Sequence, residues 1–477
     1  MKDEDAGLTA AQLDRAVGAI VGMAVGNALG SGYAFAPKPH PAEIHMRSGG
    51  LGPYTAGEWA DDTAMAIPIL EVLATGEDLL SRPVQDTVAA QWAAWVRTAK
   101  DAAPIISDVL KAYDPGAGAE SLRRAAAVLH AAGTAAAGNG SLMRTTPITL
   151  GYLHDEAGLA LAARTYSDLT HGNPEAAEAC ILWNLAQRHA ILEGRFDVRV
   201  GLGSLPANRA SRWEETIGTA EAGLPQDFAI RNGWGAQMVQ TVWSAITHSD
   251  VTGPGHFEET LRLVVASGGD TPTSAAVAGS LLGARWGVSA IPLEWRRHIH
   301  GWPGLRDADL QRLAWQAATG KRWPAQFDLP PMSIPPVRHP EDRDILLGGA
   351  RGLRPLPDEI DAVVSLCRLG ERQVPSPPVA DADHINVWLI DSDNPADNPN
   401  LTLVAEQTVG MLMTLREEGR SVYLHCDDGR SRTPFIASLY GARLTDHPAR
   451  EVLREIQQAV PLARLNPVFQ RMVYTFT

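Results

Sequence analysis

The chain has 477 residues, which predicts two to four domains of ordinary size rather than a single one. Asp and Glu number 55 against 41 Lys and Arg, and this acidic excess argues against nucleic-acid binding, which needs clustered cations. Hydrophobic residues make up 45% and charged residues 20%, close to globular averages, so the chain is expected to fold around buried cores.

The cysteines and the N-terminus predict a protein of the reducing cytoplasm. Cys180, Cys367 and Cys426 lie far apart and have neither the spacing of a disulfide framework nor that of a zinc site. The first residues, Met-Lys-Asp-Glu-Asp, are acidic where a signal peptide would be basic. No apolar run reaches the roughly 18 residues that span a bilayer. We therefore expect neither export nor membrane binding.

Residues 9–320 have the pattern of a large all-helical domain. The stretch is rich in alanine, and apolar side chains recur at helical spacing, as in Val84, Val88, Trp92 and Trp95. Strand-like alternation is scarce. Any chemistry in this region is therefore expected on the glycine-containing loops that connect the helices.

Four segments of this helical region carry polar residues suited to a ligand site. They are residues 22–30, 57–63, 138–144 and 268–273. The adjacent carboxylates of Asp61 and Asp62 suit a hard, oxygen-preferring cation such as Mg²⁺ or Mn²⁺, and Asp270 and Thr273 could complete the shell. The alternative for the two adjacent aspartates is capping of a helix predicted over residues 64–73.

In this order the four segments resemble those of the ADP-ribosylglycohydrolase family, and the similarity spans roughly residues 12–320. The resemblance implies an all-helical fold with a two-metal site that cleaves ADP-ribose from modified targets. It also implies a flexible ADP-ribose-binding loop, formed by Gly138, Asn139, Gly140, Ser141 and Met143.

The chain departs from the family pattern at four positions near the expected ligands. The family usually has Asp, Glu, Thr and Asp where this chain has Asn27, Ala34, Ala60 and Pro272. Proline offers no side-chain oxygen, and the acid missing at position 34 would act on metal-bound water. We therefore expect at most one divalent metal ion, bound weakly by the three aspartates named above.

A proline-rich stretch predicts the domain boundary. Six prolines occur between Trp323 and Pro340, and proline both blocks helix propagation and stiffens an extended connector. We predict a helical domain at 9–322, a linker at 323–341 and a second domain at 342–477.

Beyond the linker, short β-rich runs alternate with helical patterns. Strands are predicted at residues 362–366, 385–390 and 421–425, and helices at 404–418, 433–442 and 450–460. Such alternation is typical of a small α/β domain.

The strand at 421–425 leads into a cysteine-containing loop that ends where a helix begins, near Thr433. A strand, a tight loop and a helix in this order can bind a phosphate through backbone N–H groups and the helix N-terminus. The helix end and Arg432 would stabilise Cys426 as a nucleophilic thiolate. Arg432 would also bind two phosphoryl oxygens, while Thr433 would donate to the departing sulfur. The alternative is a buried structural cysteine.

These residues resemble the signature of the protein tyrosine and dual-specificity phosphatase superfamily, which is His-Cys, five residues, then Arg and Ser or Thr. The resemblance covers about residues 346–476 and implies a cysteine-dependent phosphatase without a cofactor. Its phosphate-binding loop would consist of Asp427, Asp428, Gly429, Arg430, Ser431 and Arg432. The two loop carboxylates are unusual and should disfavour polyanionic substrates such as inositol lipids.

The resemblance also implies a general-acid aspartate roughly thirty residues before the cysteine. Asp393 is the favoured candidate and Asp391 the second, with turn capping as the alternative for either. The sequence thus predicts a phosphatase for phosphorylated protein or a small phosphomonoester, joined to an ADP-ribosylglycohydrolase-like domain with a degenerate metal site.

Two alternatives remain open for the whole protein. In one, the helical domain is an ADP-ribose-binding pseudoenzyme or scaffold that brings ADP-ribosylated protein to the phosphatase. In the other, both domains are active hydrolases, and the helical one depends on a metal ion despite Ala34 and Pro272.

Overall fold

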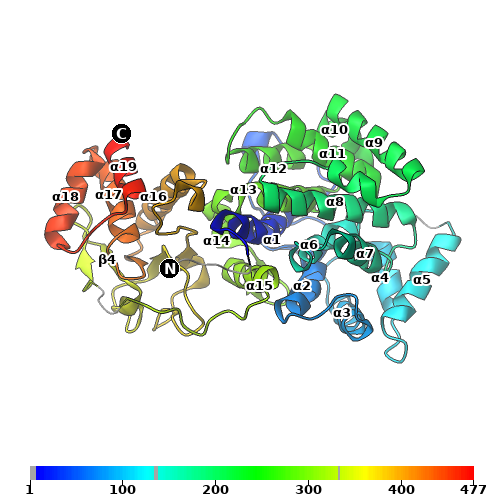
Figure 1. The fold of residues 1–477 in the computed structure, drawn as a ribbon, viewed down its shortest axis with the longest axis horizontal. Coiled ribbons are helices and arrows are strands. Elements are labelled where there is room, and N and C mark those ends of the chain that lie inside the picture. Colours follow the sequence, from blue (N-terminus) through cyan, green and yellow to red (C-terminus); the bar gives the residue numbers. More distant parts are fainter. Residues whose placement is uncertain (1–6, 134–137, 331–333, 477) are drawn as a thin grey trace. The chain divides into compact units, whose positions relative to one another are not determined.

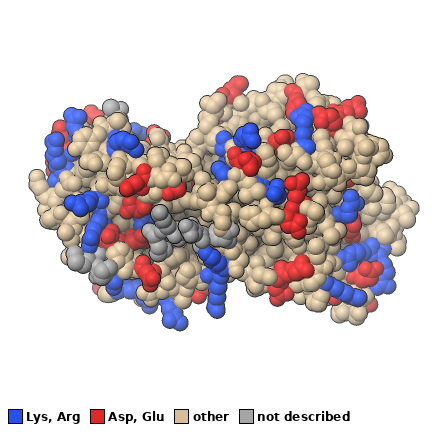
Figure 2. Space-filling view, in the orientation of Figure 1, with Lys and Arg blue, Asp and Glu red and all other residues tan. Residues whose placement is uncertain are grey.

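The structure is a computed structural model that describes residues 7–133, 138–330 and 334–476 (Figure 1). The chain forms two units. The helical unit consists mainly of Gln12–Ile291 and His298–Arg322, and the α/β unit mainly of Pro292–Arg297 and Trp323–Thr477. No helix in the described ranges is long and apolar enough to cross a membrane. On the face drawn in Figure 2, acidic and basic side chains are interspersed.

The helical unit is built almost entirely from helices, as its sequence predicted. Its longer helices are α1 (Ala10–Ser31), α2 (Asp61–Ala74), α3 (Arg82–Trp95), α4 (Pro104–Lys111), α5 (Ala119–Ala131), α7 (Glu156–Ser167), α8 (Pro174–Glu193), α9 (Ala207–Ala222), α11 (Gly235–His248), α12 (His256–Ser267), α13 (Thr271–Trp286) and α15 (Asp307–Thr319). The short strands β1 (His300–Gly301) and β2 (Leu305–Arg306) form a hairpin. The helix predicted over 64–73 lies within α2, and the Val84–Trp95 pattern lies within α3.

Helices α1 and α13 pack backbone against backbone along a row of glycines. The glycines recur every fourth residue on α1, at Gly18, Gly22, Gly26 and Gly30. A β-carbon added at Gly18 would lie 2.5 Å from the carbonyl oxygen of Gly283, and the other three positions are even more restricted. Because residues four apart share one helix face, the whole row lets the two helices approach closely. The row ends at Gly30, against Thr271 in the first turn of α13.

The α/β unit has a five-stranded sheet with the order β3-β4-β7-β5-β6. Its strands are β3 (Val337–Arg338), β4 (Ile345–Gly349), β5 (Ala362–Ser365), β6 (His384–Asn386) and β7 (Val422–Cys426). Strand β3 is antiparallel to β4, and the other pairs are parallel. The helices are α16 (Leu401–Glu417), α17 (Arg432–Thr445), α18 (Ala449–Ala459) and α19 (Pro467–Thr475).

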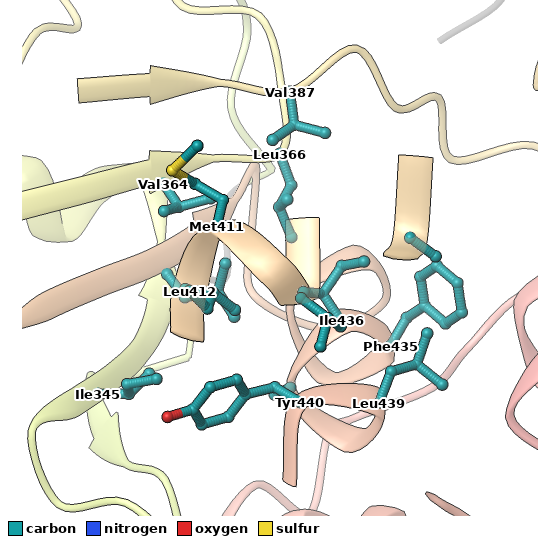
Figure 3. Close-up of a cluster of buried hydrophobic side chains, with 14 of the residues drawn as sticks. Ile345, Val364, Leu366, Val387, Met411, Leu412, Phe435, Ile436, Leu439 and Tyr440 are labelled. Atoms are coloured by element: carbon teal, nitrogen blue, oxygen red, sulfur yellow. The ribbon is translucent and has the colours of Figure 1, made fainter. Parts of the chain in front are cut away.

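The core of the α/β unit lies between the sheet and its helices, as Figure 3 shows for ten labelled residues. Ile345 and Val364 come from the sheet, and Leu412 and Ile436 come from helices α16 and α17. All residues of β7 are buried, as expected of a parallel strand in the middle of a sheet covered on both faces. Because β7 is buried along its whole length, the core holds the end of this strand in place, and the cysteine-containing loop begins there.

The elements predicted for the α/β unit agree with the structure except at one strand, and three further elements of the structure were not predicted. The strand predicted over 385–390 ends at Asn386, because its neighbour β5 ends at Ser365 and offers no further partner. Beyond it, Asn398 binds the backbone of Ile390 through both side-chain atoms, at 2.9 and 2.8 Å. Strands β3 and β4 and helix α19 were not predicted, although the run Ile-Leu-Leu of β4 is typical of a short buried strand.

The described parts of the proline-rich stretch lie against the α/β unit. Trp323 donates its indole N–H to the carbonyl of Leu369 at 3.1 Å, and the amide of Phe327 donates to Gln373 at 2.8 Å. The amide of Ile334 donates to the carbonyl of Asp428 at 3.0 Å. Residues 331–333 lie outside the described residues. The boundaries of the three predicted segments stay predictions.

Candidate active sites

The loop after β7 turns tightly at the carboxyl edge of the sheet. Cys426 ends the strand with only 1% of its surface exposed. Gly429 has a φ of 83°, and a β-carbon there would lie 2.8 Å from the carbonyl oxygen of Gly348, so a side chain is excluded. Helix α17 then begins at Arg432. The sequence therefore forms the strand, loop and helix that it predicted.

Several backbone N–H groups of this loop are unused. They belong to Asp427, Gly429, Ser431, Arg432 and Thr433, and none donates to another atom within the described residues. By contrast, the amide of Arg430 donates to the Asp428 carboxylate at 3.0 Å. Unused amides around the first turn of a helix are donors for an anion. The loop can therefore bind an anion next to Cys426.

Arg432 is the buried cation of the loop, with 7% of its surface exposed. Its Nη1 donates to the carbonyls of Leu366 and Leu389, at 2.9 and 3.2 Å, and its Nη2 donates to the Asp427 carboxylate. Burial opposes the charge, but the nearby carboxylate of Asp427 and thiol of Cys426 raise the pKa of Arg432. Its Nε is buried without a partner in the described structure. An unpaired buried donor is costly, so this N–H is suited to an anionic ligand.

The structure brings Asp391 to the loop and leaves Asp393 apart. Asp391 Oδ1 accepts hydrogen bonds from Ser431 Oγ at 2.8 Å and from Asn466 Nδ2 at 2.7 Å. Asp393 is exposed, and its carboxylate accepts no hydrogen bond from any described residue. The second candidate for the general acid is therefore closer to the cysteine-containing loop than the favoured one.

The remaining predicted loop residues have internal partners. The Thr433 hydroxyl donates to the carbonyl of Gly348 at 3.2 Å. The Asp428 carboxylate lies 3.5 Å from Arg430 Nε, and Asp427 pairs with Arg432. Each loop carboxylate is therefore neutralised by an arginine of the same loop.

In the helical unit, the predicted acidic residues gather where α2 and α13 begin. Asp61 and Asp62 form the first turn of α2, and Asp270 immediately precedes α13. Burial raises the pKa of all three, and the charges of Asp101 and Asp270 help to raise that of Asp61 to about 7. The cluster therefore disfavours full ionisation of its own carboxylates.

Asn27 binds this cluster from α1. Its Nδ2 donates to Asp62 Oδ2 at 2.6 Å. Its Oδ1 accepts the amides of Ala60 at 2.9 Å and Thr63 at 3.3 Å. Because Ala60 stands at the N-cap position without a polar side chain, Asn27 provides the missing acceptor for the first turn of α2. Neither Asp61 nor Asp62 is the N-cap residue of this helix.

The carboxylates have the oxygen chemistry that Mg²⁺ or Mn²⁺ requires. Asp62 Oδ1 is buried without a hydrogen-bond partner among the residues described, which leaves one oxygen open to a cation. Among the described residues, however, no group of three or more Asp, Glu, His or Cys side chains is arranged to hold a metal ion. Pro272, in the first turn of α13, offers no side-chain oxygen. The residues therefore fit an incomplete cation site.

The predicted ADP-ribose loop is tied to the same cluster through Asn139. Its Nδ2 donates to Asp270 Oδ2 at 2.7 Å and to the carbonyl of Asn232 at 3.0 Å. Gly138 and Gly140 stand close to His171, whose Nε2 is buried and has no partner in the described ranges. The structure thus brings the backbone of residues 138–140 beside the acidic cluster.

The side chains of the other two loop residues point into the core. Ser141 is completely buried and accepts the hydroxyl of Ser167 at 2.9 Å. Met143 has 2% of its surface exposed. These two residues support the loop from within, and their side chains are not on its surface.

A cavity of about 410 Å³ opens beside Asp61 within the helical unit. Tyr54, Trp59 and Trp302 contribute aromatic walls, and Lys100 lies at its edge. The hairpin of β1 and β2 forms part of the wall, and the amide of Trp59 donates to the carbonyl of His300 at 2.9 Å. The volume is in the range of small-ligand sites. Sequence reasoning missed this cavity, since its walls come from segments about 240 residues apart.

Comparison with known proteins gave a family match and several relatives. A model described as ADP-ribosylglycohydrolase matches residues 8–325. The ADP-ribosylarginine hydrolase Tri1 of Pseudomonas putida (strain GB-1) is 28% identical over 350 residues, which cover 71% of this chain and 83% of that protein. The ADP-ribosyl-[dinitrogen reductase] glycohydrolase of Rhodospirillum rubrum is 29% identical over 296 residues, which cover 59% of this chain and 89% of that protein.

Two solved structures match parts of the chain. One described as an ADP-ribosylglycohydrolase-related protein complex is 28% identical, with a TM-score of 0.49, and covers 65% of this chain and 98% of its own. Human DUSP28 is 19% identical, with a TM-score of 0.26, and covers 30% of this chain and 95% of its own.

Proposed function

Because the chain belongs to the ADP-ribosylglycohydrolase family, we propose that its helical unit binds an ADP-ribosyl group beside Asp61, Asp62 and Asp270. We propose further that its α/β unit hydrolyses phosphate monoesters through a cysteinyl-phosphate on Cys426. The expected ligands are ADP-ribosylated protein or ADP-ribose for the helical unit. For the α/β unit they are phosphorylated protein or a small phosphomonoester.

One observation supports the phosphatase proposal above all. The partnerless Nε of Arg432 and the unused N–H groups of the loop lie in the same short segment as Cys426. This arrangement supplies a nucleophile together with donors for the oxygens of a phosphoryl group. Such donors stabilise the transition state because they are already in place when the charge develops.

The reaction would have two steps. In the first, the Cys426 thiolate attacks phosphorus, the S–P bond forms, and the bond from phosphorus to the leaving oxygen breaks as an aspartic acid gives that oxygen a proton. In the second, the same aspartate accepts a proton from water while the water oxygen attacks phosphorus. The S–P bond breaks, and orthophosphate leaves with the thiolate restored.

Asp391 is better placed than Asp393 to be the acid. Ser431, a residue of the loop, donates to Asp391 Oδ1, and so does Asn466. Both hydrogen bonds end on the same oxygen, which leaves Oδ2 to carry the transferred proton. We therefore assign the acid to Asp391.

The phosphatase proposal is tested by replacing the nucleophile in the full chain. Cys426→Ser should lower the release of phosphate from para-nitrophenyl phosphate by at least about a thousandfold, because a serine hydroxyl is far less ionised than a thiol. Cys180→Ser is the control, since Cys180 is a buried cysteine of the helical unit. If Cys426→Ser keeps the rate of the parent protein, the proposal is wrong.

For the helical unit, the open oxygen of Asp62 favours a second function, which is metal-dependent hydrolysis of the ADP-ribosyl bond. Asp61, Asp62, Asp270 and Thr273 would hold Mg²⁺ or Mn²⁺, which when bound supplies Lewis-acid activation of water. Asn139 would orient Asp270 through their 2.7 Å hydrogen bond. Ala34 and Pro272, by contrast, favour binding without turnover, because each lacks the carboxylate expected at its position.

Calorimetry and a release assay separate these two functions. Titrations with Mg²⁺, Mn²⁺ and ADP-ribose would report binding, and release of ADP-ribose from ADP-ribosylarginine protein would report turnover. Binding of ADP-ribose without release identifies an ADP-ribose-binding unit, and metal-dependent release identifies a hydrolase. No heat with ADP-ribose and no release would contradict both.

A further inference from the structure

Behind Cys426, one buried hydroxyl lies between two imidazoles. Ser365, the last residue of β5, is completely buried. Its Oγ lies 2.7 Å from His425 Nε2 and 2.9 Å from His384 Nε2. The other ring nitrogen of His425, Nδ1, lies 3.1 Å from the carbonyl oxygen of Cys426. Four residues from three strands therefore form one continuous chain of hydrogen bonds.

The register of the sheet brings these residues together. Ser365 of β5 pairs with His425 of β7, and Val363 pairs with His384 of β6. Paired residues and residues two apart share one face of a sheet, so all three polar side chains project from the same face. Cys426 follows His425 directly, so its side chain projects from the opposite face. The hydrogen-bond chain thus reaches Cys426 through its backbone.

The groups at the ends of the hydrogen-bond chain determine which of its atoms carry the protons. A carbonyl oxygen only accepts, so His425 Nδ1 carries a hydrogen. Burial lowers the pKa of His425 to about 3, so the ring is neutral and its Nε2 accepts the hydroxyl proton of Ser365. Ser365 has no second proton, so its oxygen accepts from His384 Nε2. Burial lowers the pKa of His384 to about 4, which leaves that ring neutral as well.

The direction of donation has a consequence for the anion loop. Donation runs from His384 to Ser365, then to His425, then to the carbonyl of Cys426. In a trans peptide the C=O and the following N–H point in opposite directions. A carbonyl held by His425 therefore directs the amide of Asp427 away from His425. That amide is one of the unused donors of the loop.

We propose that Ser365 and His384 are positioning residues that act through His425 on the peptide between Cys426 and Asp427. The role in catalysis rests on the proposed phosphatase function, whereas the hydrogen-bond chain itself does not. The charged groups that act on the two rings are Asp381 near His384, and Asp427 and Arg432 near His425. Sequence reasoning did not find Ser365 or His384, because only the pairing of three strands places them behind the loop.

The first test is spectroscopic and needs no activity. In the full chain labelled with ¹⁵N-histidine, we expect neutral His425 with its proton on Nδ1 and neutral His384 with its proton on Nε2. Ser365→Ala should leave the proton of His425 on Nδ1, where the carbonyl of Cys426 accepts it, and should shift the ¹⁵N resonance of Nε2, which loses the hydroxyl that donates to it. The control is Ser438→Ala, which removes a buried hydroxyl that donates to the carbonyl of Phe435 at 2.8 Å. A proton on Nε2 of His425 in the parent protein would overturn the proposal.

The second test is kinetic. Ser365→Ala should lower kcat for para-nitrophenyl phosphate about tenfold while KM changes less than about twofold, the effect of one lost hydrogen bond that orients the loop. Ser365→Thr keeps the hydroxyl and should retain most of kcat. His384→Gln keeps a hydrogen-bond donor near the Nε2 position, whereas His384→Leu has none. The kcat of His384→Gln should therefore be higher than that of His384→Leu.

The two tests keep the possible failures apart. If the folded Ser365→Ala protein has the kcat of the parent, the positioning role is wrong although the phosphatase function stands. If the parent protein releases no phosphate, the phosphatase function is wrong, and the tautomer of His425 still decides whether the hydrogen-bond chain exists.

Discussion

The side-chain amide of Asn27 donates to the carboxylate of Asp62 across 2.6 Å, so a neutral group from α1 binds a buried acid at the start of α2. Both residues are completely buried. In the family pattern an aspartate usually stands at position 27, where it would face Asp62 with the same charge. Asn27 thus allows the acidic cluster to pack here without a cation between these two residues.

Restoring that aspartate should make folding depend on a metal ion. We expect Asn27→Asp to lower the free energy of unfolding at pH 7 by about 3 kcal/mol, because an unpaired buried charge is added beside Asp62. Millimolar Mg²⁺ or Mn²⁺ should recover part of this loss, since a cation neutralises both carboxylates. Urea unfolding with and without the metal measures both effects.

The matched control for that change is Asn184→Asp. Asn184 is also completely buried, but it donates to Thr145 Oγ1 at 2.9 Å and to the carbonyl of Cys180. Its variant should lose stability without recovery by metal. Equal recovery of the two variants would contradict a cation site at Asp62.

The raised pKa of Asp61 predicts a pH dependence of stability. A folded-state pKa of about 7 lies above the unfolded value of about 3.9, so the folded protein binds more protons between these limits. The stabilising contribution of Asp61 to the free energy of unfolding is therefore fully present below pH 4 and is lost as the pH rises through 7. The amide that replaces this carboxyl in Asp61→Asn does not titrate. The variant should therefore be more stable than the parent protein at pH 8, by on the order of 2 kcal/mol.

Denaturant unfolding at several pH values measures this difference. The gain from Asp61→Asn should shrink as the pH falls from 8 to 4. Asp250→Asn changes an exposed aspartate and should show no such trend. A gain that is constant with pH would mean that charge on Asp61 is not its cause.

The pairing of Asp427 with Arg432 predicts that this carboxylate weakens anion binding. Asp427→Asn removes a negative charge that occupies one guanidinium nitrogen. We expect inorganic phosphate to inhibit the variant about tenfold more tightly, because one repulsive charge next to the anion is lost. Competition against para-nitrophenyl phosphate measures the inhibition constant.

Asp428→Asn is the control for this prediction. Asp428 lies near Arg430 rather than Arg432, at 3.5 Å from its Nε. Its change should strengthen inhibition by phosphate less than Asp427→Asn does. The same gain in both variants would show that general loop charge, and not the pairing with Arg432, governs anion affinity.

The two candidate acids can be compared directly. Asp391→Asn should lower kcat by about a hundredfold or more with little change in KM, because an amide cannot give its proton to the leaving oxygen. Asp393→Asn should leave kcat within about twofold of the parent, as the Asp393 carboxylate accepts no hydrogen bond from any described residue of the loop. The opposite result would restore the assignment favoured by sequence spacing.

The contrast between these aspartates shows what the sequence could predict. Local patterns predicted β7, α17 and the loop between them, because period, turn residues and helix start are properties of neighbouring residues. Spacing along the chain could not decide between Asp391 and Asp393, which are two residues apart. That choice depends on hydrogen bonds from Ser431 and Asn466, which come from other parts of the sequence.

Asn27 was predicted as a missing ligand, and the structure gives it a partner. An absent carboxylate is visible in a sequence motif, but the geometry that lets an amide cap α2 and bind Asp62 depends on how α1 packs. Ser365 and His384 were missed for a similar reason. Their proximity follows from the register of the paired strands, and that register cannot be predicted from either residue alone.

The glycine row of α1 has a consequence for how tolerance to mutation should be interpreted in this protein. Gly26 lies against the backbone of Ala275, and a single methyl group there would move the two helices apart. Asn27 on one helix and Asp270 before the other would then separate, although neither had been altered. A complete mutational scan would therefore rank these glycines with the acidic residues, and their intolerance would report an interhelical distance rather than any chemistry of their own.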